Sequence, residues 1–191
     1  MQNVCSRWIP KLSDDHKARR MGSALTFFTC YSTEGEGFLK LIVTGDETWI
    51  QYVTKGTIQS GGTSVMVWDV CSWRDIGPLI RLETTLTGDR YLSILPDHLH
   101  SFMSIVHSDG LEQFQQENAI PHTSRVATKW LQEHSSYFRH FHWTSKSPEK
   151  DIIEDIRDAL LHAVEKRSPP PRTPIDLLTA LQDSWCEFPP G

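Results

Sequence analysis

The feature that most constrains this chain is the apolar run at residues 39–43, which leads into Gly45 and Asp46. Its β-favouring residues predict a buried first strand over residues 38–44. Glycine would end that strand, so Asp46 would lie just past its end. A carboxylate at the carboxyl end of a central strand is where α/β folds place their ligands. Because aspartate is also common in turns, Asp46 needs acidic partners elsewhere in the chain to count as a site.

Further runs and spacings predict an α/β fold. Apolar segments indicate four more strands, at residues 64–72, 78–85, 111–118 and 138–143, with a loop at 51–63 and a turn at 75–77. Helical spacing predicts helices that begin after Thr87, after Thr123 or Ser124, after Pro148 and after Thr173. Pro96 should kink or break the first of these. The order β-β-β-α-β-α-β-α predicts a mixed five-stranded sheet flanked by helices.

Composition shifts divide the chain into three expected segments. Residues 1–35 form an arm and a helix, which Ser13 or Asp14 caps and which carries an apolar stripe of Met21, Leu25 and Phe28. Residues 36–167 form the core. Residues 168–191 form a proline-rich linker and a last amphipathic helix.

Charge and composition limit the function classes. The net charge is −5 and the isoelectric point is near 6.0. DNA-binding domains are usually basic, so we expect only weak DNA binding by this chain alone; an acidic catalytic core remains compatible with the composition. No apolar run approaches the ~20 residues of a membrane helix, so we expect no membrane partner. The four cysteines are far apart and are expected to be free thiols.

Two later motifs complete the pattern that begins with Gly-Asp-Glu-Thr-Trp at 45–49. They are Gln-Glu-Asn-Ala-Ile-Pro-His-Thr-Ser at 116–124 and Lys-Ser-Pro-Glu-Lys-Asp-Ile-Ile-Glu at 146–154. Together the three resemble the catalytic domain of Tc1/mariner transposases, which are RNase H-like enzymes. The resemblance implies an acidic metal-binding and catalytic triad, with supporting residues beside the second acid; the triad is Asp46, Glu117 and Glu154, and the supporting residues are Asn118 and His122. An alternative role for His122 is a bond to the start of the following helix.

The family chemistry implies a cofactor, a substrate and a location. Two Mg²⁺ or Mn²⁺ ions held by the triad would support DNA strand cleavage and transfer, the chemistry of DNA transposition and integration. The family also implies a nuclear location, DNA as ancestral partner, and association with a second copy or with full-length relatives. Residues 64–188 resemble the Tc1 branch and residues 1–50 the mariner branch, which suggests a junction near residues 50–63.

Several positions depart from the family pattern. Glu117 replaces an aspartate, and a carboxylate displaced by about 1 Å can lower the rate on the order of 100-fold. Asp69 stands where a glycine is usual and Arg157 where a tryptophan packs; a buried aspartate needs a partner or a proton. The DNA-recognition domains of the family are missing from this sequence. We therefore expect a truncated, transposase-derived protein with impaired activity, the alternative being a catalytically dead dimerisation or interaction module.

Overall fold

The computed structural model describes residues 13–52, 63–83, 85–106, 112–116, 119–137, 139–142 and 152–188. At its centre lies a five-stranded sheet in the order β3-β2-β1-β4-β5. The strands are β1 (Ile42–Tyr52), β2 (Thr63–Ser72), β3 (Ile76–Leu82), β4 (Gln113–Gln116) and β5 (Arg139–His142). β2 is antiparallel to both β1 and β3, whereas β4 is parallel to β1 and β5. The predicted mixed five-stranded sheet is confirmed.

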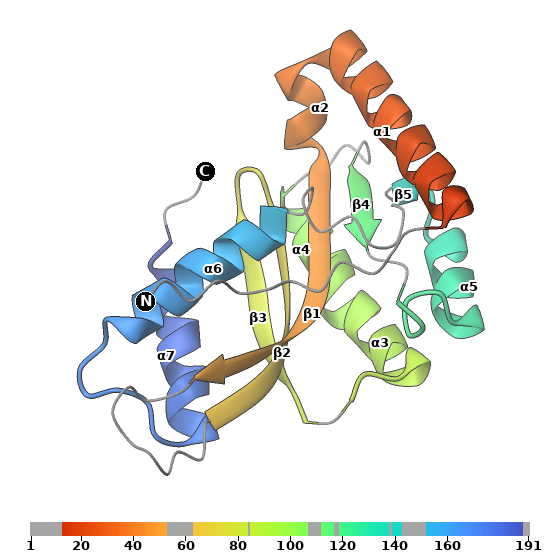
Figure 1. The fold of residues 1–191 in the computed structure, drawn as a ribbon. Coiled ribbons are helices and arrows are strands. Elements are labelled where there is room, and N and C mark those ends of the chain that lie inside the picture. The colour runs from red at the N-terminus through yellow and green to blue at the C-terminus, as the bar shows by residue number, and fades with distance from the viewer. Residues whose placement is uncertain are drawn as a thin grey trace.

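Helices cover both faces of this sheet (Figure 1). One face carries α3 (Gly88–Ile94), a π-helical segment η1 (Leu95–His100), α4 (Ser101–Val106) and α5 (Arg125–Glu133). The other carries α6 (Ile152–Glu165) and α7 (Pro174–Cys186). α1 (Asp14–Glu34) and the short α2 (Glu36–Lys40) precede β1, and α1 extends away from the α6 and α7 side (Figure 1).

The alternation of side chains along the central strands builds one core on each face. Val43, Trp68 and Phe114 pack with α3, η1, α4 and α5. Ile50, Val65 and Val67 pack with α6 and α7. β1 and β2 are therefore buried on both faces, and a charged side chain on either strand needs a partner.

The first strand differs from its prediction. β1 begins at Ile42, since Phe38 to Lys40 belong to α2, and it continues through Gly45 to Tyr52. Asp46 therefore lies within β1 rather than past its end. The reason is tertiary: a Cβ on Gly45 would lie 3.0 Å from the Trp68 ring and 3.4 Å from the Asp69 carbonyl oxygen. Glycine here permits close packing of the strand instead of ending it.

The second hairpin is also shifted toward the N-terminus. β3 ends at Leu82, and Ile76 and Gly77, predicted as turn, belong to it. The Ser72 hydroxyl closes the turn, because it accepts hydrogen bonds from the backbone N–H groups of Arg74 (3.2 Å) and Asp75 (3.0 Å). Strands β4 and β5, at 113–116 and 139–142, fall within the fourth and fifth predicted strands, whose end residues 111, 117, 118, 138 and 143 lie outside the described residues.

Helix signals in the sequence were more accurate. The hydroxyls of Thr87, Ser124 and Thr173 each accept a backbone N–H at a helix start, as predicted. The break predicted at Pro96 is confirmed as the π-helical segment η1, which accommodates a residue without a backbone donor. The helix start predicted after Pro148 lies outside the described residues, and the described helix α6 begins at Ile152.

Two predicted apolar faces are exposed. Met21, Leu25 and Phe28 on α1 are 60–65% exposed, so this stripe is not buried within the chain. Val126, predicted to face inward from α5, is also exposed, whereas Ala127 and Leu131 are buried. At about 100° per residue, Val126 and Leu131 lie about 140° apart around the helix axis, so Val126 stands at the exposed edge of the face that Ala127 and Leu131 bury.

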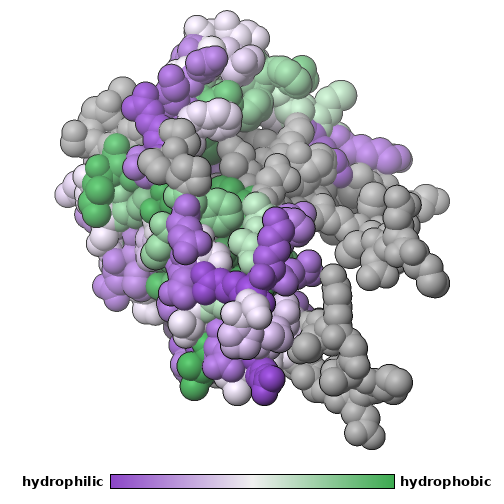
Figure 2. Space-filling model, turned by 90° about the vertical axis from the view of Figure 1, so that its left-hand side faces the viewer, coloured by the Kyte–Doolittle hydropathy of each residue, from purple (hydrophilic) through white to green (hydrophobic). Residues whose placement is uncertain are grey.

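The outer surface is mixed in character. Hydrophilic and hydrophobic residues are interspersed over the coloured part of the face shown in Figure 2. In the described part of the chain, no helix combines the length and hydropathy needed to cross a membrane. Cys30, Cys71 and Cys186 are thiols outside any disulfide, as predicted for these three.

Candidate active site

Two aspartates face each other across the central strands. Asp46 on β1 is the register partner of Asp69 on β2. Asp69 is fully buried and the side chain of Asp46 is only 13% exposed. Like charges directly opposite each other on neighbouring strands repel, and burial strengthens the repulsion. This pair therefore requires a cation.

Arg157 of α6 supplies that cation. Its Nη1 donates to Asp46 Oδ2 at 2.8 Å, while its Nε and Nη2 donate to the two carboxylate oxygens of Asp69 at 3.1 and 3.0 Å. The guanidinium fork thus binds Asp69 through two bonds and Asp46 through one. The Arg157 side chain is 8% exposed. The prediction that a buried Asp69 needs a partner is confirmed, and the two family departures at 69 and 157 form one ion pair.

Arg157 keeps its positive charge in this cluster. Burial by itself lowers the pKa of the Arg157 guanidinium, but the negative charges of Asp69 and then Asp46, with their hydrogen bonds, raise that pKa well above its ordinary value. Arg157 is therefore a fixed positive charge at any pH at which the protein is folded.

The neighbouring acid, Glu47, contacts a buried histidine. Its Oε2 lies 2.7 Å from Nε2 of His122, which is 1% exposed. The His122 ring packs on Tyr91 of α3 with centroids 4.3 Å apart. The Tyr91 hydroxyl donates to Gln116, the last residue of β4. This chain of contacts links β1, the loop before α5, α3 and β4 at one end of the sheet.

Tyr91 provides a pH test of this network. Burial, followed by the charges of Glu47 and Asp46, raises the pKa of its phenol well above the usual value of 10.0. A raised native pKa means that the stabilisation is complete below about pH 10 and declines as pH rises further, because the unfolded chain then loses the proton first. At neutral pH, Tyr91→Phe should lower the free energy of unfolding by about 1–3 kcal/mol, since Gln116 loses a buried partner.

The measurement is urea unfolding of both proteins at about pH 8 and about pH 10.5, either side of the usual tyrosine pKa. The difference in free energy of unfolding between Tyr91→Phe and the parent chain should shrink at the higher pH. Tyr31→Phe, which alters an exposed tyrosine, is the matched control and should show no such change. A difference that is constant with pH would contradict the assignment.

Donor atoms suited to a metal ion lie at this end of the sheet. One ligand atom each from Asp46, Glu47 and His122 can be found within 4.8 Å of one another. Carboxylate oxygens are the ligands that Mg²⁺ prefers, and Mn²⁺ also accepts imidazole. The donor set therefore fits a divalent cation of this kind, although Asp46 already holds the guanidinium of Arg157.

The predicted site residues have different outcomes. Asp46 lies on β1 and His122 is buried against Glu47. Glu117 and Asn118 lie outside the described residues, directly after β4. Glu154 belongs to α6, three residues before Arg157, and its side chain lies outside the described part. The assignment of Asp46, Glu117 and Glu154 as a triad stays a prediction.

Sequence reasoning did not pair Arg157 with Asp69 and did not include Glu47. Asp69 interrupts a run of apolar residues in β2, and Arg157 lies on the apolar side of α6 between Ile153 and Leu160. An acid on one apolar surface and a base on another could have indicated this pair from the sequence, because each buried charge needs a partner of opposite sign. Glu47 directly follows Asp46 in the Gly-Asp-Glu-Thr-Trp motif, but that motif was used to select Asp46 alone.

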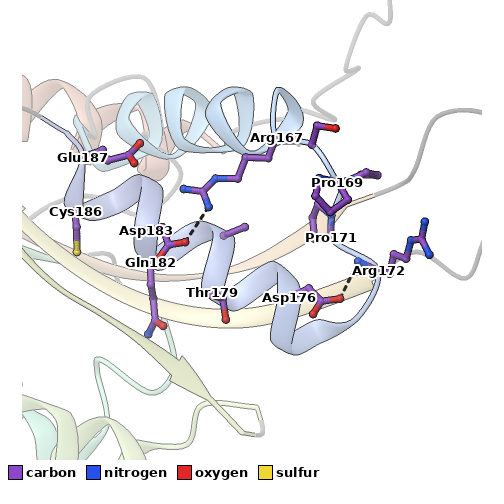
Figure 3. Close-up of a pocket in the computed structure, with 13 residues that line it drawn as sticks. Arg167, Pro169, Pro171, Arg172, Asp176, Thr179, Gln182, Asp183, Cys186 and Glu187 are labelled. Carbon is purple, nitrogen blue, oxygen red and sulfur yellow. Dashed lines mark hydrogen bonds and ion pairs between the residues drawn. The ribbon is translucent and has the colours of Figure 1, made fainter.

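A separate groove lies away from these residues. It has a volume of about 1300 Å³ and runs between the proline-rich segment 168–172 and α7 (Figure 3). Arg167 donates to Asp183 at 2.9 Å across it, and Asp176 accepts from the backbone of Arg172 and Thr173. These contacts fasten α7 to the end of α6. Of the predicted site residues whose side chains the structure describes, neither Asp46 nor His122 lines this groove.

Comparisons with known proteins agree with the motifs. No family model matches the chain. It is 32% identical over 107 residues to the transposable element Tc1 transposase of Caenorhabditis elegans, covering 54% of this chain and 37% of that protein. It is 31% identical over 136 residues to the Tcb1 transposase of Caenorhabditis briggsae, covering 70% and 47%. The chain thus spans less than half the length of these curated relatives.

The fold matches that of a mariner enzyme. The Mos1 transposase catalytic domain, solved with raltegravir and Mg, has a TM-score of 0.74 at 18% identity, covering 94% of this chain and 86% of that chain. A Mos1 paired-end complex with the left transposon end has a TM-score of 0.62 at 19% identity, covering 97% and 64%. The predicted resemblance is confirmed: the chain has a Tc1-like sequence and the RNase H-like fold of a Tc1/mariner transposase catalytic domain.

Proposed function

We propose that this chain is a transposase-derived catalytic core that acts on DNA strands through a divalent-metal site, and that its strand cleavage and transfer are impaired. The observation that carries the proposal is the contact between Asp46 and Arg157. It brings α6, the helix that includes Glu154, against the strand that carries the first acid. This arrangement supports Asp46, Glu117 and Glu154 as the metal-holding and catalytic residues.

In this proposal the residues of the chain orient and hold, while bound Mg²⁺ or Mn²⁺ would activate the attacking hydroxyl and stabilise the leaving oxygen. Asp46 would present a carboxylate oxygen from β1, Glu117 from the end of β4 and Glu154 from α6. The network of Glu47, His122 and Tyr91 would fix the end of β4 beside β1. Mos1 structures solved with Mg and with Mn support this choice of cation.

The proposed partner is DNA, and the proposed location is the nucleus. Neighbouring Mos1 structures are complexes with transposon ends. We attribute the impairment to Glu117, since the additional methylene would displace the second carboxylate by about 1 Å and lower the rate on the order of 100-fold.

Metal-dependent melting tests the proposal. Mn²⁺ should raise the melting temperature of Glu117→Asp more than that of the parent chain, because a ligand that binds the native state stabilises it. Asp46→Asn should abolish the rise, whereas Asp158→Asn, which alters an exposed carboxylate on α6, should not. Glu117→Asp should also nick supercoiled DNA about 100-fold faster than the parent. An equal melting shift in all four proteins would indicate unspecific binding and refute the site.

A second candidate function is a non-catalytic dimerisation module. The exposed stripe of Met21, Leu25 and Phe28 on α1 favours it, because an apolar helix face of this kind often contacts another helix. Sedimentation of the parent chain and of Leu25→Glu distinguishes the two. Two results together would favour the dimerisation module. The parent chain would self-associate and Leu25→Glu would abolish that association, and Mn²⁺ would not raise the melting temperature of Glu117→Asp.

A further inference from the structure

The guanidinium of Arg157 balances the negative charges of the acidic site. Arg157 Nη1 lies 2.8 Å from Asp46 Oδ2, the first acid of the proposed metal site. The same guanidinium binds both oxygens of Asp69, which is fully buried. It therefore bridges two carboxylates, the geometric role that a divalent cation otherwise fills in such sites.

Asp69 fixes this guanidinium in place. The guanidinium donates two charge-assisted hydrogen bonds to the Asp69 carboxylate. Because that carboxylate is buried, water cannot replace these bonds. Arg157 also cannot yield its charge by losing a proton, as a lysine could. The contact with Asp46 therefore ends only if the whole side chain moves, and that movement would break both hydrogen bonds from Arg157 to the buried Asp69.

We propose that Arg157, anchored by Asp69, is an autoinhibitory counter-ion that competes with divalent metal for Asp46. This inference rests on the proposed metal-dependent function. A divalent cation held by Asp46 would share its carboxylate with the fixed positive charge of Arg157, which already donates to Oδ2. Metal occupancy and the Arg157–Asp46 contact thus oppose each other. Asp69 acts as a positioning residue for the inhibitory group.

The test uses the paired substitution Asp69→Gly with Arg157→Trp, which removes both charges of the Asp69–Arg157 pair together and releases Asp46, whose side chain is 13% exposed, from the guanidinium. All proteins are compared in the parent chain and in the Glu117→Asp background, so that the second acid does not limit binding. Mn²⁺ affinity is measured by calorimetry, with circular dichroism as the check on folding. Arg167→Gln, which removes a cation from the end of the α6 region remote from Asp46, is the matched control.

The paired substitution should tighten Mn²⁺ binding about tenfold or more, since a like charge is removed from beside the ligand atom. Asp46→Asn added to it should abolish the gain, and Arg167→Gln should change nothing. Equal Mn²⁺ affinity with and without Arg157 would overturn the competition while leaving the proposed function standing. No Mn²⁺ binding by any folded protein, in either background, would overturn the proposed function and this inference with it.

Arg157→Lys provides a second, independent measurement. A lysine keeps the charge but loses the fork to Asp69, so the cation is free to move away from Asp46. Mn²⁺ affinity should fall between those of the parent and the paired substitution. An affinity equal to that of the parent would show that charge alone, without anchoring by Asp69, sets the competition, and would overturn the positioning role of Asp69.

Discussion

Replacing Arg157 by methionine is expected to lower the free energy of unfolding by about 3–5 kcal/mol, because breaking a buried ion pair leaves an uncompensated charge. Methionine fills a similar volume, so the loss of packing is small. In the variant, the fully buried Asp69 loses both hydrogen bonds from Arg157 and faces Asp46 across the strands. The measurement is urea unfolding near neutral pH, followed by circular dichroism.

The control is a double-mutant cycle. Asp69→Asn alone should also destabilise the chain, since Arg157 then keeps only one carboxylate. Asp69→Asn with Arg157→Met should cost clearly less than the sum of the two single changes, because the coupled charges are removed together. If the two losses simply add, Asp69 and Arg157 act independently, and the buried cluster does not hold α6 on the sheet.

This result would change how the departures from the family pattern are interpreted. Taken separately, Asp69 and Arg157 suggested loss of a working core. In the structure they compensate each other, across 88 positions in the sequence. Such a pair is a coupled replacement within one contact, and we find no sign in it that the fold has been damaged.

Local signals in the sequence predicted most of the architecture. Helix caps at Thr87, Ser124 and Thr173 depend on a side chain and a backbone N–H two or three residues away. The local sequence is therefore enough to predict them. The order of strands and helices along the chain also predicted the mixed sheet, because three successive strands followed by alternating helices and strands is an α/β arrangement. The π-helical segment at Pro96 follows from the missing donor of a single residue.

Features that depend on distant contacts were not predicted. Gly45 was taken as the end of a strand, yet it continues β1 because Trp68 packs where a Cβ would lie. Val126 was placed inward by its hydrophobicity, although Ala127 occupies that direction. At the candidate site, Asp46 was chosen by motif, whereas its contact with Arg157 depends on how α6 crosses the sheet. Periodicity contains no information about that crossing.

The anchoring of α6 leads to the second large prediction, at Trp185 of α7. Its ring is 4% exposed in the core that includes Leu160 of α6 and Val67 of β2, and its Nε1 donates to the Gly77 carbonyl of β3 at 2.7 Å. Trp185→Ala should therefore lower the free energy of unfolding by about 3–5 kcal/mol, through the cavity and the lost packing. Urea unfolding of the full chain measures this.

Two controls separate burial from the hydrogen bond and from tryptophan content. Trp185→Phe keeps most of the apolar area but leaves the Gly77 carbonyl without this donor, and should cost about 1–3 kcal/mol. Trp49→Ala removes a tryptophan that is 57% exposed on β1, and should change the free energy of unfolding by less than about 1 kcal/mol. A loss at Trp185 no larger than that at Trp49 would mean that α7 is dispensable for the fold. In that case the packing of α6, and with it the reach of Arg157 to Asp46, would have to depend on the buried ion pair itself.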